Sequence, residues 1–371
     1  MTPSPKSATD SRGTKILVRS TNWIGDSVMT MPAIQRLREF APESYIALLC
    51  PGKLHDLWAH NPYINEIIPF GRRVNVRHLR DCKFDVAIIF PNSLRSAWEC
   101  QRAEIPRRIG FAGHWRRFLL TDIVPQPHSE RAAYEKRTVA DKEFKVKVFR
   151  SLRHQSQHYL DIIARLGGSS EPVPPRVFLA AQELPPLNKF LRDDGRPVLA
   201  LNAGAEYGPA KRWPVERFAE VAIKVSERTD CRWLILGGRG DVSIAASVEE
   251  KLRMAKLEQD TVINVAGKTT LLDLCALLTF CKVLLTNDTG PMHIAAAIGT
   301  PVVSVWGSTS PELTGPMGAD NVVIRQPVEC SPCFLRKCPI DFRCMNRVEV
   351  DAVVSAVLKR VVVTDKPYWQ T

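Results

Sequence analysis

Short apolar runs alternate with amphipathic stretches through the first half of the chain. The stretches Ser27–Phe40 and His154–Leu166 carry apolar residues at helical spacing and are predicted helices. The segment 121–147 is polar and irregular by comparison. The apolar runs that predict buried strands are Lys15–Arg19, Tyr45–Cys50, Glu66–Phe70, Asp85–Phe90 and Arg108–Phe111. Continuous hydrophobic strands that alternate with helices are typical of a parallel sheet covered on both faces.

The same alternation restarts after a segment, 171–196, that holds five prolines and has the composition of a linker. The predicted strands that follow are Val198–Asn202, Arg232–Gly237, Val262–Val265, Val283–Thr286 and Val302–Trp306. The predicted helices are Val215–Glu227, Val242–Lys256, Leu271–Phe280, an Ala-rich stretch after Gly290, and Val348–Arg360.

Two halves of this kind predict an α/β fold with two doubly wound, Rossmann-like domains facing a cleft. The expected boundaries are 14–184 for the first domain, 185–196 for the linker and 197–347 for the second domain. Residues 1–13 are expected to form a disordered tail, and the helix within 348–371 is expected to pack back on the first domain.

The net charge of the chain says more about its binding partner than its overall composition does. The 371 residues are 45% hydrophobic, which is ordinary, but the net charge of +12 implies an anionic nucleic acid, membrane surface or phosphorylated substrate. The basic residues form small clusters such as Arg72-Arg73 and Arg116-Arg117 rather than one long run, which disfavours nucleic acid. Because no apolar signal segment and no run of roughly 18 apolar residues is present, we expect a cytoplasmic protein with peripheral membrane contact.

Four of the ten cysteines lie together between Cys330 and Cys344, with the spacing C-x2-C-x4-C-x5-C. Cysteines of a cytoplasmic chain are expected to be thiols rather than disulfides. A zinc or iron–sulfur site is one interpretation of the cluster. The other is a reduced, oxidation-sensitive loop, which the apolar residues between the cysteines favour because they are typical of packing.

A polar turn, Asn287–Pro291, separates a buried strand from an Ala-rich helix. A helix N-terminus has free N–H groups and a partial positive charge, so this turn suits a phosphate. The alternative is an ordinary junction with Asp288 or Thr289 as the N-cap. A second polar loop, Gly307–Pro311, follows the next strand, and ligands of α/β sheets bind where such loops meet.

The turn after the first strand contains Gly25 and Asp26, and Asp26 is either a helix N-cap or a general base beside a substrate hydroxyl. This turn lacks the G-x-G-x-x-G fingerprint of dinucleotide-binding folds. In the second half, the loop Asn202–Pro214 carries Lys211 and Arg212, which either neutralise a departing diphosphate or are simply solvated. The chain contains no Asp-x-Asp pair, which is a common metal-binding pattern in such enzymes. Its absence favours Lys211 and Arg212, rather than a metal ion, as the groups that neutralise the diphosphate.

These segments, in this order, resemble the lipopolysaccharide heptosyltransferases over roughly residues 14 to 362. The likeness rests on the Asn22–Asp26 turn, the Lys211-Arg212-Trp213-Pro214 loop, Asn287–Val303, Gly307–Pro316 and Cys330–Met345. The last of these favours the enzyme that adds the second heptose of the inner core. Within the stretch 131–147 the likeness is weaker.

The resemblance implies an inverting GT-B glycosyltransferase that uses ADP-L-glycero-D-manno-heptose and requires neither a cofactor nor a tightly bound metal. It makes Asp26 the general base and Lys211 the group that stabilises the leaving diphosphate. The implied donor-binding residues are Gly25, Arg212, Arg239, Asp288, Thr289, Gly290, Pro291, Met292, His293 and Thr309. The expected acceptor-binding residues are Asn22, Trp23, Arg72, Arg73, Asn92, Arg95, Arg116 and Arg117.

The implied partners are ADP-heptose, heptosylated Kdo–lipid A and the inner face of the cytoplasmic membrane, without nucleic acid. Within the family, the enzyme that adds the first heptose, or a homologue that transfers another sugar, is the alternative. A nucleotide-dependent oxidoreductase or epimerase would require a Gly-rich fingerprint with an acidic residue about 20 positions on, and none is visible. A Cys-rich metal-binding protein is the third class.

Overall fold

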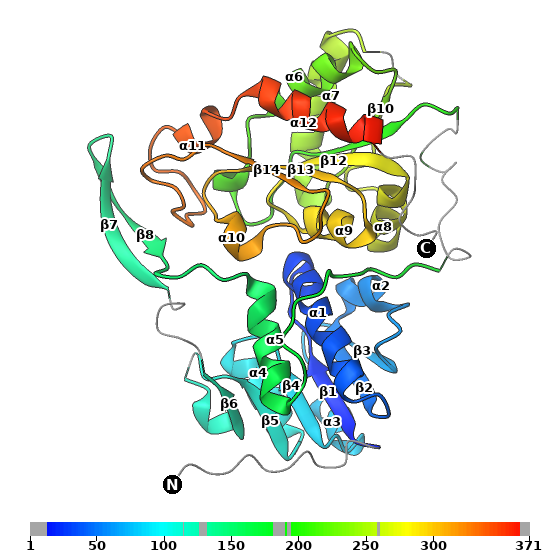
Figure 1. Ribbon diagram of the computed structural model, residues 1–371, viewed down its shortest axis with the longest axis vertical. Helices are drawn as coiled ribbons and strands as arrows, with labels where there is room; N and C mark the ends of the chain where they lie inside the picture. The colour runs from blue at the N-terminus through cyan, green and yellow to red at the C-terminus, as the bar shows by residue number, and fades with distance from the viewer. Residues whose placement is uncertain are drawn as a thin grey trace. The chain divides into compact units, whose positions relative to one another are not determined.

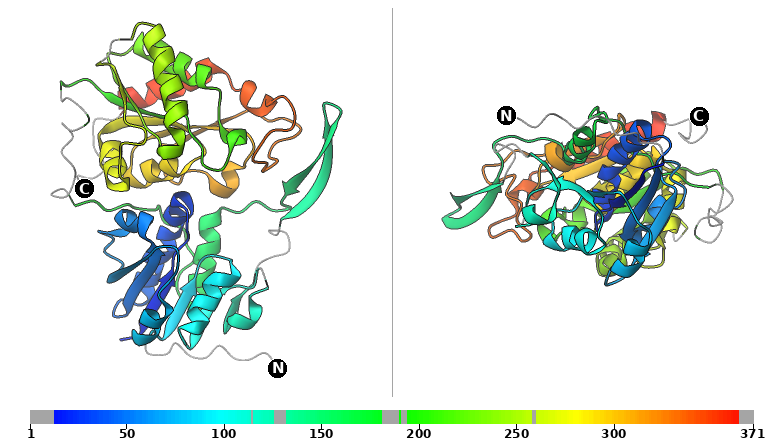
Figure 2. Two further views of the ribbon diagram at one scale, coloured as in Figure 1. Left: turned by 180° about the vertical axis from the view of Figure 1, so that it is seen from behind. Right: turned by 90° about the horizontal axis from the view of Figure 1, so that it is seen from below.

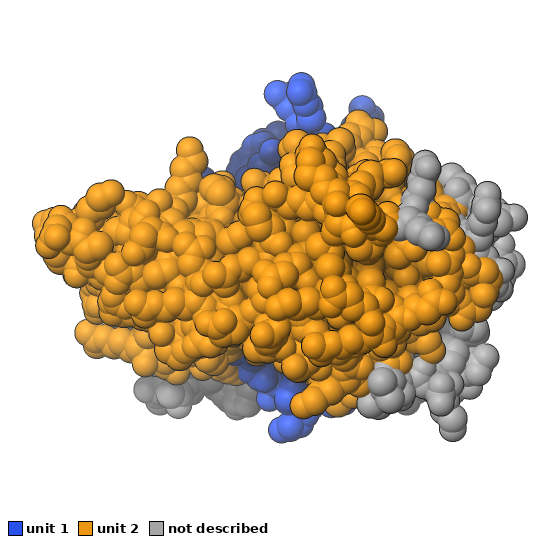
Figure 3. Space-filling view, turned by 90° about the horizontal axis from the view of Figure 1, so that it is seen from above, with its two compact units in different colours: residues 1–128, 154–178 blue, residues 129–153, 179–371 orange. Residues whose placement is uncertain are grey.

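The computed structural model describes residues 13–113, 115–125, 132–180, 190, 194–257 and 260–363. The chain forms two compact units, which Figure 3 distinguishes by colour. The first unit holds residues 1–128 and 154–178, and the second holds 129–153 and 179–371. Residues 1–12 of the predicted tail, 1–13, and most of the predicted linker, 185–196, lie outside the described residues.

The first unit is built on a six-stranded parallel sheet with the strand order β3-β2-β1-β4-β5-β6. Its strands are β1 (Lys15–Arg19), β2 (Tyr45–Pro51), β3 (Glu66–Phe70), β4 (Val86–Ile89), β5 (Arg107–Phe111) and β6 (Asp122–Val124). Its helices are α1 (Ile24–Phe40), η1 (Gly52–Leu54), α2 (His55–Trp58), α3 (Val76–Asp81), α4 (Leu94–Arg102), η2 (Arg117–Leu119) and α5 (Gln155–Leu166).

Alternate residues of these strands face opposite layers of helices, as the period of a β-strand requires. Leu17, Leu49 and Ile89 share a buried cluster with residues of α3 and α4. Helices α1 and α5 pack against each other and cover the other face (Figures 1 and 2).

The second unit repeats this plan, with the strand order β11-β10-β9-β12-β13-β14 and all neighbours parallel. Its sheet contains β9 (Val198–Asn202), β10 (Arg232–Ile235), β11 (Val262–Asn264), β12 (Cys281–Asn287), β13 (Val302–Trp306) and β14 (Val322–Arg325). Its helices are η6 (Pro209–Lys211), α6 (Val215–Ser226), η7 (Arg239–Asp241), α7 (Val242–Met254), α8 (Leu271–Phe280), α9 (Gly290–Ile298), α10 (Pro311–Thr314), α11 (Arg343–Asn346) and α12 (Val350–Val363).

Each sheet reverses its strand order once, between β1 and β4 in the first unit and between β9 and β12 in the second. Loops at the carboxyl ends of those strands diverge to opposite faces of the sheet and leave a crevice, where ligands of such folds bind. The turn with Asp26 follows β1, and the loops with Lys211 and Asp288 follow β9 and β12. The sequence therefore places its main candidate residues at the two reversal points.

All predicted strands are present, with ends that shift by one or two residues at most. The prediction of two doubly wound domains is confirmed by the two sheets. The edge strands β6 and β14 are missing from the prediction because they are short and only partly buried.

The prediction that 121–147 is irregular is wrong. After β6, β7 (Ala133–Val139) and β8 (Lys142–Val148) form an antiparallel hairpin (Figure 1). This hairpin belongs to the second unit. Among its residues only Val139 and Val146 are buried, so the sequence shows almost no hydrophobic alternation. The hairpin is held by distant residues instead, since the Arg137 guanidinium donates to the Glu329 carbonyl at 3.4 Å.

The expectation that the last helix packs on the first domain is also wrong. Helix α12 belongs to the second unit and packs against α6, β12, β13 and β14. Val353, Val354 and Val357 are almost fully buried in the core of that unit. The apolar stripe of α12 therefore completes one face of the second sheet.

We predict that Val357→Ala lowers the free energy of unfolding of the second unit by about 2 kcal/mol, because it removes buried methyl groups and leaves a cavity. The matched control is Lys359→Ala on the exposed side of the same helix, which should change stability by less than about 0.5 kcal/mol. Chemical denaturation of the full chain provides the measurement. Equal effects of the two substitutions would contradict the packing of α12.

Candidate active site

The Asn287 side chain joins the two loops at the reversal point of the second sheet. Asn287 is fully buried at the end of β12. Its Nδ2 donates to the Ala203 carbonyl at 2.9 Å and to the Gly204 carbonyl at 3.3 Å, and its Oδ1 accepts from the Trp213 N–H at 3.0 Å. One amide thus fixes both ends of the loop that carries Lys211.

Lys211, Asp288 and Thr309 form a buried polar cluster beside this amide. The Lys211 ammonium makes an ion pair with the Asp288 carboxylate, and the Thr309 hydroxyl donates to Asp288 Oδ2 at 2.7 Å. The side chains of Lys211 and Asp288 are only 13% and 5% exposed. Residues predicted from three separate loops are therefore brought into contact.

Each residue of this cluster has a neighbour in the chain with a buried polar atom that lacks a partner among the described residues. The Thr289 and Ser308 hydroxyls and Arg212 Nε are buried and make no hydrogen bond among the described residues. Thr289 is the N-cap of α9 but does not cap it with its side chain, and Pro291 follows in the first turn. Because buried polar groups are normally paired, these atoms could pair with a polar ligand, and the hydroxyl of Thr289 lies at the N-terminus of α9, which suits an anion.

The remaining residues of the second unit that were predicted to bind the donor substrate differ in exposure and in the groups available to a ligand. Arg239 lies exposed in the turn after β10. Gly290 and Pro291 form the first turn of α9, where the N–H of Gly290 is free of the helix ladder. Met292 is fully buried and His293 is 5% exposed, so Met292 could contribute only its backbone to a cradle for phosphates.

The Cys-rich segment, Cys330–Cys344, contacts the loop that carries Lys211. The Ala210 N–H donates to the Arg336 carbonyl at 3.0 Å, and the Tyr207 hydroxyl donates to the Phe334 carbonyl at 2.7 Å. Gly208 has φ +150°, and a Cβ there would lie 2.6 Å from the Arg336 carbonyl oxygen. The Tyr207 ring contacts two cations, with Lys211 Nζ at 4.8 Å and Arg336 Cζ at 5.1 Å from its centroid.

In the first unit, Asp26 is not the N-cap of α1, contrary to the simpler of its two interpretations. Helix α1 begins at Ile24 after the N-cap Trp23, so Asp26 and Gly25 lie within its first turn. Asp26 Oδ1 accepts from the Gln155 amide at 3.0 Å, and the same nitrogen donates to the Tyr159 hydroxyl at 2.7 Å. Burial, with the nearby Asp26 charge, raises the pKa of Tyr159, so this phenol stays neutral.

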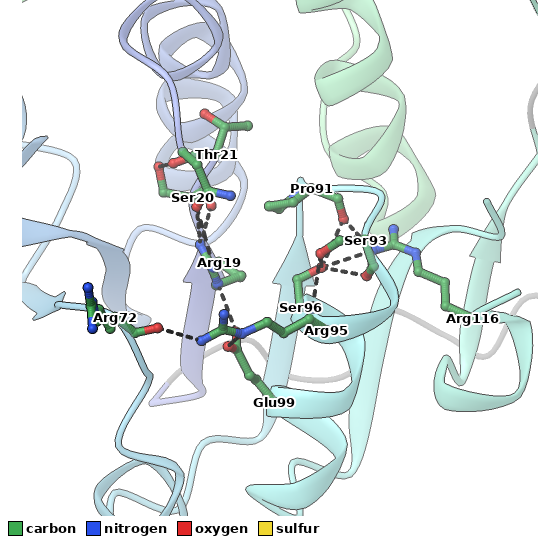
Figure 4. Close-up of polar contacts among 11 residues, drawn as sticks. Arg19, Ser20, Thr21, Arg72, Pro91, Ser93, Arg95, Ser96, Glu99 and Arg116 are labelled. Carbon is green, nitrogen blue, oxygen red and sulfur yellow. Dashed lines mark hydrogen bonds and ion pairs between the residues drawn. The ribbon is translucent and has the colours of Figure 1, made fainter. Parts of the chain in front are cut away.

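A chain of charges connects the end of β1 to α4, and Figure 4 shows its members Arg19, Glu99 and Arg95. The buried Glu99 carboxylate accepts from Arg19 Nε at 3.3 Å and from Arg95 Nε at 2.9 Å. Arg95 also donates to the Arg72 carbonyl at 2.8 Å, and Arg19 donates to Asn22 Oδ1 at 3.4 Å. Three of the predicted acceptor residues are therefore linked through one buried carboxylate.

Arg116 was predicted to bind the acceptor, but its side chain is fully buried and does not reach the surface. Its guanidinium donates to the carbonyls of Phe111, at 2.7 Å, and Pro91, and to Ser96 Oγ and Asn92 Oδ1, each at 3.3 Å (Figure 4). Burial lowers the pKa of Arg116 to about 10, so the group is still charged at neutral pH. It ties the loop after β5 to the start of α4 and is not a surface cation.

The other predicted acceptor residues lie on the surface of the first unit. Trp23 is 55% exposed, and Lys53 Nζ lies 5.0 Å from the centroid of its ring. The exposed polar and basic residues are Asn22, Arg72, Arg73, Asn92, Arg95 and Arg117.

Several residues of the site escape the sequence-based reasoning. Gln155 and Glu99 lie on helices and belong to no motif, and only the packing of α5 and α4 brings them to the end of β1. Ser308 lies within the predicted Gly307–Pro311 loop, and the run of three hydroxyl residues in that loop, 308–310, is the sequence signal that points to it.

Comparison with known proteins identifies the family. Residues 72–342, more than half of the chain, match glycosyltransferase family 9 (heptosyltransferase). The chain belongs to glycosyltransferase family 9. It is therefore an enzyme that transfers glycosyl groups, and the predicted GT-B fold of two doubly wound domains is confirmed.

Family 9 relatives match the chain over most of its length. Lipopolysaccharide heptosyltransferase 2 of Escherichia coli (strain K12) is 30% identical over 338 residues, or 84% of this chain and 88% of that protein. Lipopolysaccharide heptosyltransferase 1 of Pseudomonas aeruginosa is 25% identical over 345 residues, or 87% of each. The solved structure of the E. coli ADP-heptose LPS heptosyltransferase II is 25% identical, with a TM-score of 0.75 and coverage of 94% of this chain and 98% of that one.

The four clustered cysteines of this family 9 chain, Cys330, Cys333, Cys338 and Cys344, line one pocket of about 10 Å³. They are free thiols, and within the described ranges no group of three or more His, Cys, Asp or Glu is arranged to hold a metal ion. Burial raises the pKa of Cys344 to about 12 and also raises the pKa of Cys330 and Cys333. Ile340 and Phe342 pack against the core, as their positions between the cysteines predict.

We predict that iodoacetamide at neutral pH modifies Cys344 at least tenfold more slowly in the folded enzyme than in urea, because the thiolate is the reactive form and burial opposes its formation. Peptide mass mapping measures the rates, with the partly exposed Cys82 as an internal control that reacts faster. Rapid modification of folded Cys344 would contradict a buried thiol. Resistance that persists in urea would indicate a bound metal or a disulfide instead.

Proposed function

We propose that this enzyme transfers L-glycero-D-manno-heptose from ADP-heptose to the heptosylated Kdo–lipid A inner core, in the manner of a heptosyltransferase 2. The higher identity to a heptosyltransferase 2 than to a heptosyltransferase 1, 30% against 25%, supports this choice. The observation that carries the proposal is the Lys211–Asp288 pair, next to two buried hydroxyls that have no partner in the part of the chain that the structure describes.

The polar cluster of the second unit has the groups that a sugar diphosphate requires. The N-terminus of α9 and the unpaired hydroxyls of Thr289 and Ser308 offer donors to phosphate oxygens. Asp288 accepts hydrogen bonds, so it suits the hydroxyls of the heptose rather than the phosphates. Lys211 would then meet the negative charge that grows on ADP as the glycosidic bond breaks.

Asp26 is the group proposed to receive the proton of the acceptor. The acceptor oxygen attacks the anomeric carbon, the bond from that carbon to ADP breaks, and the hydroxyl proton passes to the Asp26 carboxylate. Gln155 supports this role because its amide donates to Asp26 at 3.0 Å yet cannot take up the proton itself. A single displacement of this kind inverts the anomeric configuration.

The acceptor is anionic, which fits the exposed arginines of the first unit. Arg72, Arg73, Arg95 and Arg117 are the proposed contacts for its phosphates and Kdo carboxylates. Glu99 holds Arg95 in place through a 2.9 Å hydrogen bond, so at least one of these cations is preorganised. Because the acceptor is a lipid, the enzyme is proposed to act at the inner face of the cytoplasmic membrane.

Release of ADP from ADP-heptose is expected with Kdo–lipid A that already carries one heptose, and not with Kdo–lipid A alone. Background hydrolysis is controlled with Lys211→Ala, which should lower kcat because it removes a cation that acts mainly in the transition state. Turnover only with the heptose-free acceptor would instead make this a heptosyltransferase 1. No turnover with either acceptor would overturn the proposed substrate.

Asp26→Asn should lower kcat at least a hundredfold while ADP-heptose binds as before, because the amide keeps the hydrogen bond to Gln155 but cannot accept a proton. Single-turnover kinetics and calorimetric titration with donor separate the two effects. Asp56→Asn removes an exposed carboxylate from the same unit and should leave both unchanged. More than a tenth of the original kcat in Asp26→Asn would exclude Asp26 as the base.

A further inference from the structure

Four large apolar side chains lie exposed on one part of the first unit. Leu94 and Trp98 on α4 are 46% and 47% exposed, and Trp115 and Phe118 beside and within η2 are 92% and 76% exposed. Trp115 also has φ +58°, in the left-handed region that bulky residues rarely adopt. Packing in the core therefore does not explain why these four positions carry large apolar side chains.

The fold brings these side chains to one surface. Leu94 and Trp98 are one helical turn apart, so they share a face of α4. Helix α4 packs against η2, and Leu119 of η2 lies in the same buried cluster as Ala97 of α4. The buried Arg116 guanidinium, next in the chain to Trp115, contacts the start of α4 through Ser96 and fixes the loop there (Figure 4).

Exposed arginines lie on the segments that carry the apolar side chains and on the segment 71–77, which Arg95 contacts. Arg102 Cζ lies 5.7 Å from the centroid of the Trp98 ring, and Arg95 donates to the Arg72 carbonyl. The exposed arginines of the segments 71–77, 94–102 and 115–120 are Arg72, Arg73, Arg77, Arg95, Arg102 and Arg117. The one carboxylate in these three segments, Glu99, is buried and paired with Arg19 and Arg95. We call Leu94, Trp98, Trp115, Phe118 and these arginines the aromatic–arginine patch.

We propose that the aromatic–arginine patch docks the enzyme on the surface of an anionic phospholipid bilayer. Tryptophan and phenylalanine insert at the level of the headgroups, and arginines bind the phosphates around them. No helix in the described part of the chain is long and apolar enough to cross a membrane. The inference rests on the proposed function only in assuming that the acceptor lies in a membrane.

A second copy of the chain is the less suitable occupant. In a two-fold dimer built on this patch, each copy would present its arginines to the same arginines of its partner, without an exposed carboxylate from these segments to pair with them. Phospholipid headgroups supply the opposite charge.

The test is co-sedimentation of the full chain with vesicles of phosphatidylcholine, with or without about one-third phosphatidylglycerol. The enzyme should bind the anionic vesicles at least tenfold more tightly than the neutral ones, and less tightly as the salt concentration rises. The combined variant Trp98→Ala, Trp115→Ala, Phe118→Ala should lose at least tenfold of that binding. The double variant Trp115→Ala, Phe118→Ala repeats the test if the triple variant does not fold.

The matched control removes exposed apolar side chains of the second unit. Tyr134, Met254 and Phe280 are 69%, 73% and 41% exposed, and their combined replacement by alanine should leave vesicle binding unchanged. Equal loss in the control and the patch variant would overturn the proposal, as would wild-type enzyme that ignores anionic vesicles. A patch variant that abolishes concentration-dependent dimers or binding to RNA, but not vesicle binding, would assign the surface to that other partner.

Activity measurements separate this proposal from the proposed function. With an acceptor from which the acyl chains have been removed, the patch variant should keep the kcat/KM of the wild type, because no membrane is involved. With acceptor embedded in anionic vesicles it should lose at least tenfold. If the wild type is inactive on both acceptors, the proposed function fails while the vesicle-binding result still stands. Equal loss on the soluble acceptor would overturn the proposal and place Trp98, Trp115 and Phe118 in binding of the acceptor itself, together with the four patch arginines already proposed to contact it.

Discussion

The geometry of the second unit depends on the buried amide of Asn287, which satisfies two carbonyls and one N–H of a loop that follows a different strand. This interaction requires a donor and an acceptor in one planar group, so neither a carboxylate nor an apolar residue of the same size could replace it. Because the next residue is Asp288, the same amide also sets where the carboxylate meets the Lys211 ammonium. Asn287 therefore both satisfies the backbone of the Lys211 loop and positions the neighbouring Asp288 carboxylate.

Both units place a buried ion pair at the reversal point of their sheet, Arg19 with Glu99 in one and Lys211 with Asp288 in the other. Such pairs contribute little net stability, since desolvation offsets most of the attraction. Their value here is geometric. Each holds a charged group at the carboxyl ends of the central strands, where a flexible side chain in water would sample many positions.

The alternation of apolar runs was sufficient to predict both sheets, because every central strand is buried on two faces and therefore continuously hydrophobic. The hairpin β7–β8 and the place of α12 could not be predicted, since each depends on contacts with residues far away in the chain. The residues of the candidate site also fall into a predictable group and an unpredictable one. Lys211, Asp288 and Thr309 lie on loops with recognisable composition, whereas Gln155 reaches Asp26 only through helix packing. Arg116 resembled its exposed neighbour Arg117 in sequence, and only the carbonyls around it distinguish the two.

The hairpin also constrains the order in which the enzyme can form during synthesis. Arg137 contacts Glu329, which lies 192 residues later in the chain. At ribosomal rates of about 5–20 residues per second, the hairpin emerges roughly 10 to 40 s before its partner segment exists. During that interval its exposed strand edges are open to pairing with other nascent chains. Lys136 of β7 and the three lysines of β8, Lys142, Lys145 and Lys147, oppose such pairing by charge repulsion, before the protein is folded as well as afterwards.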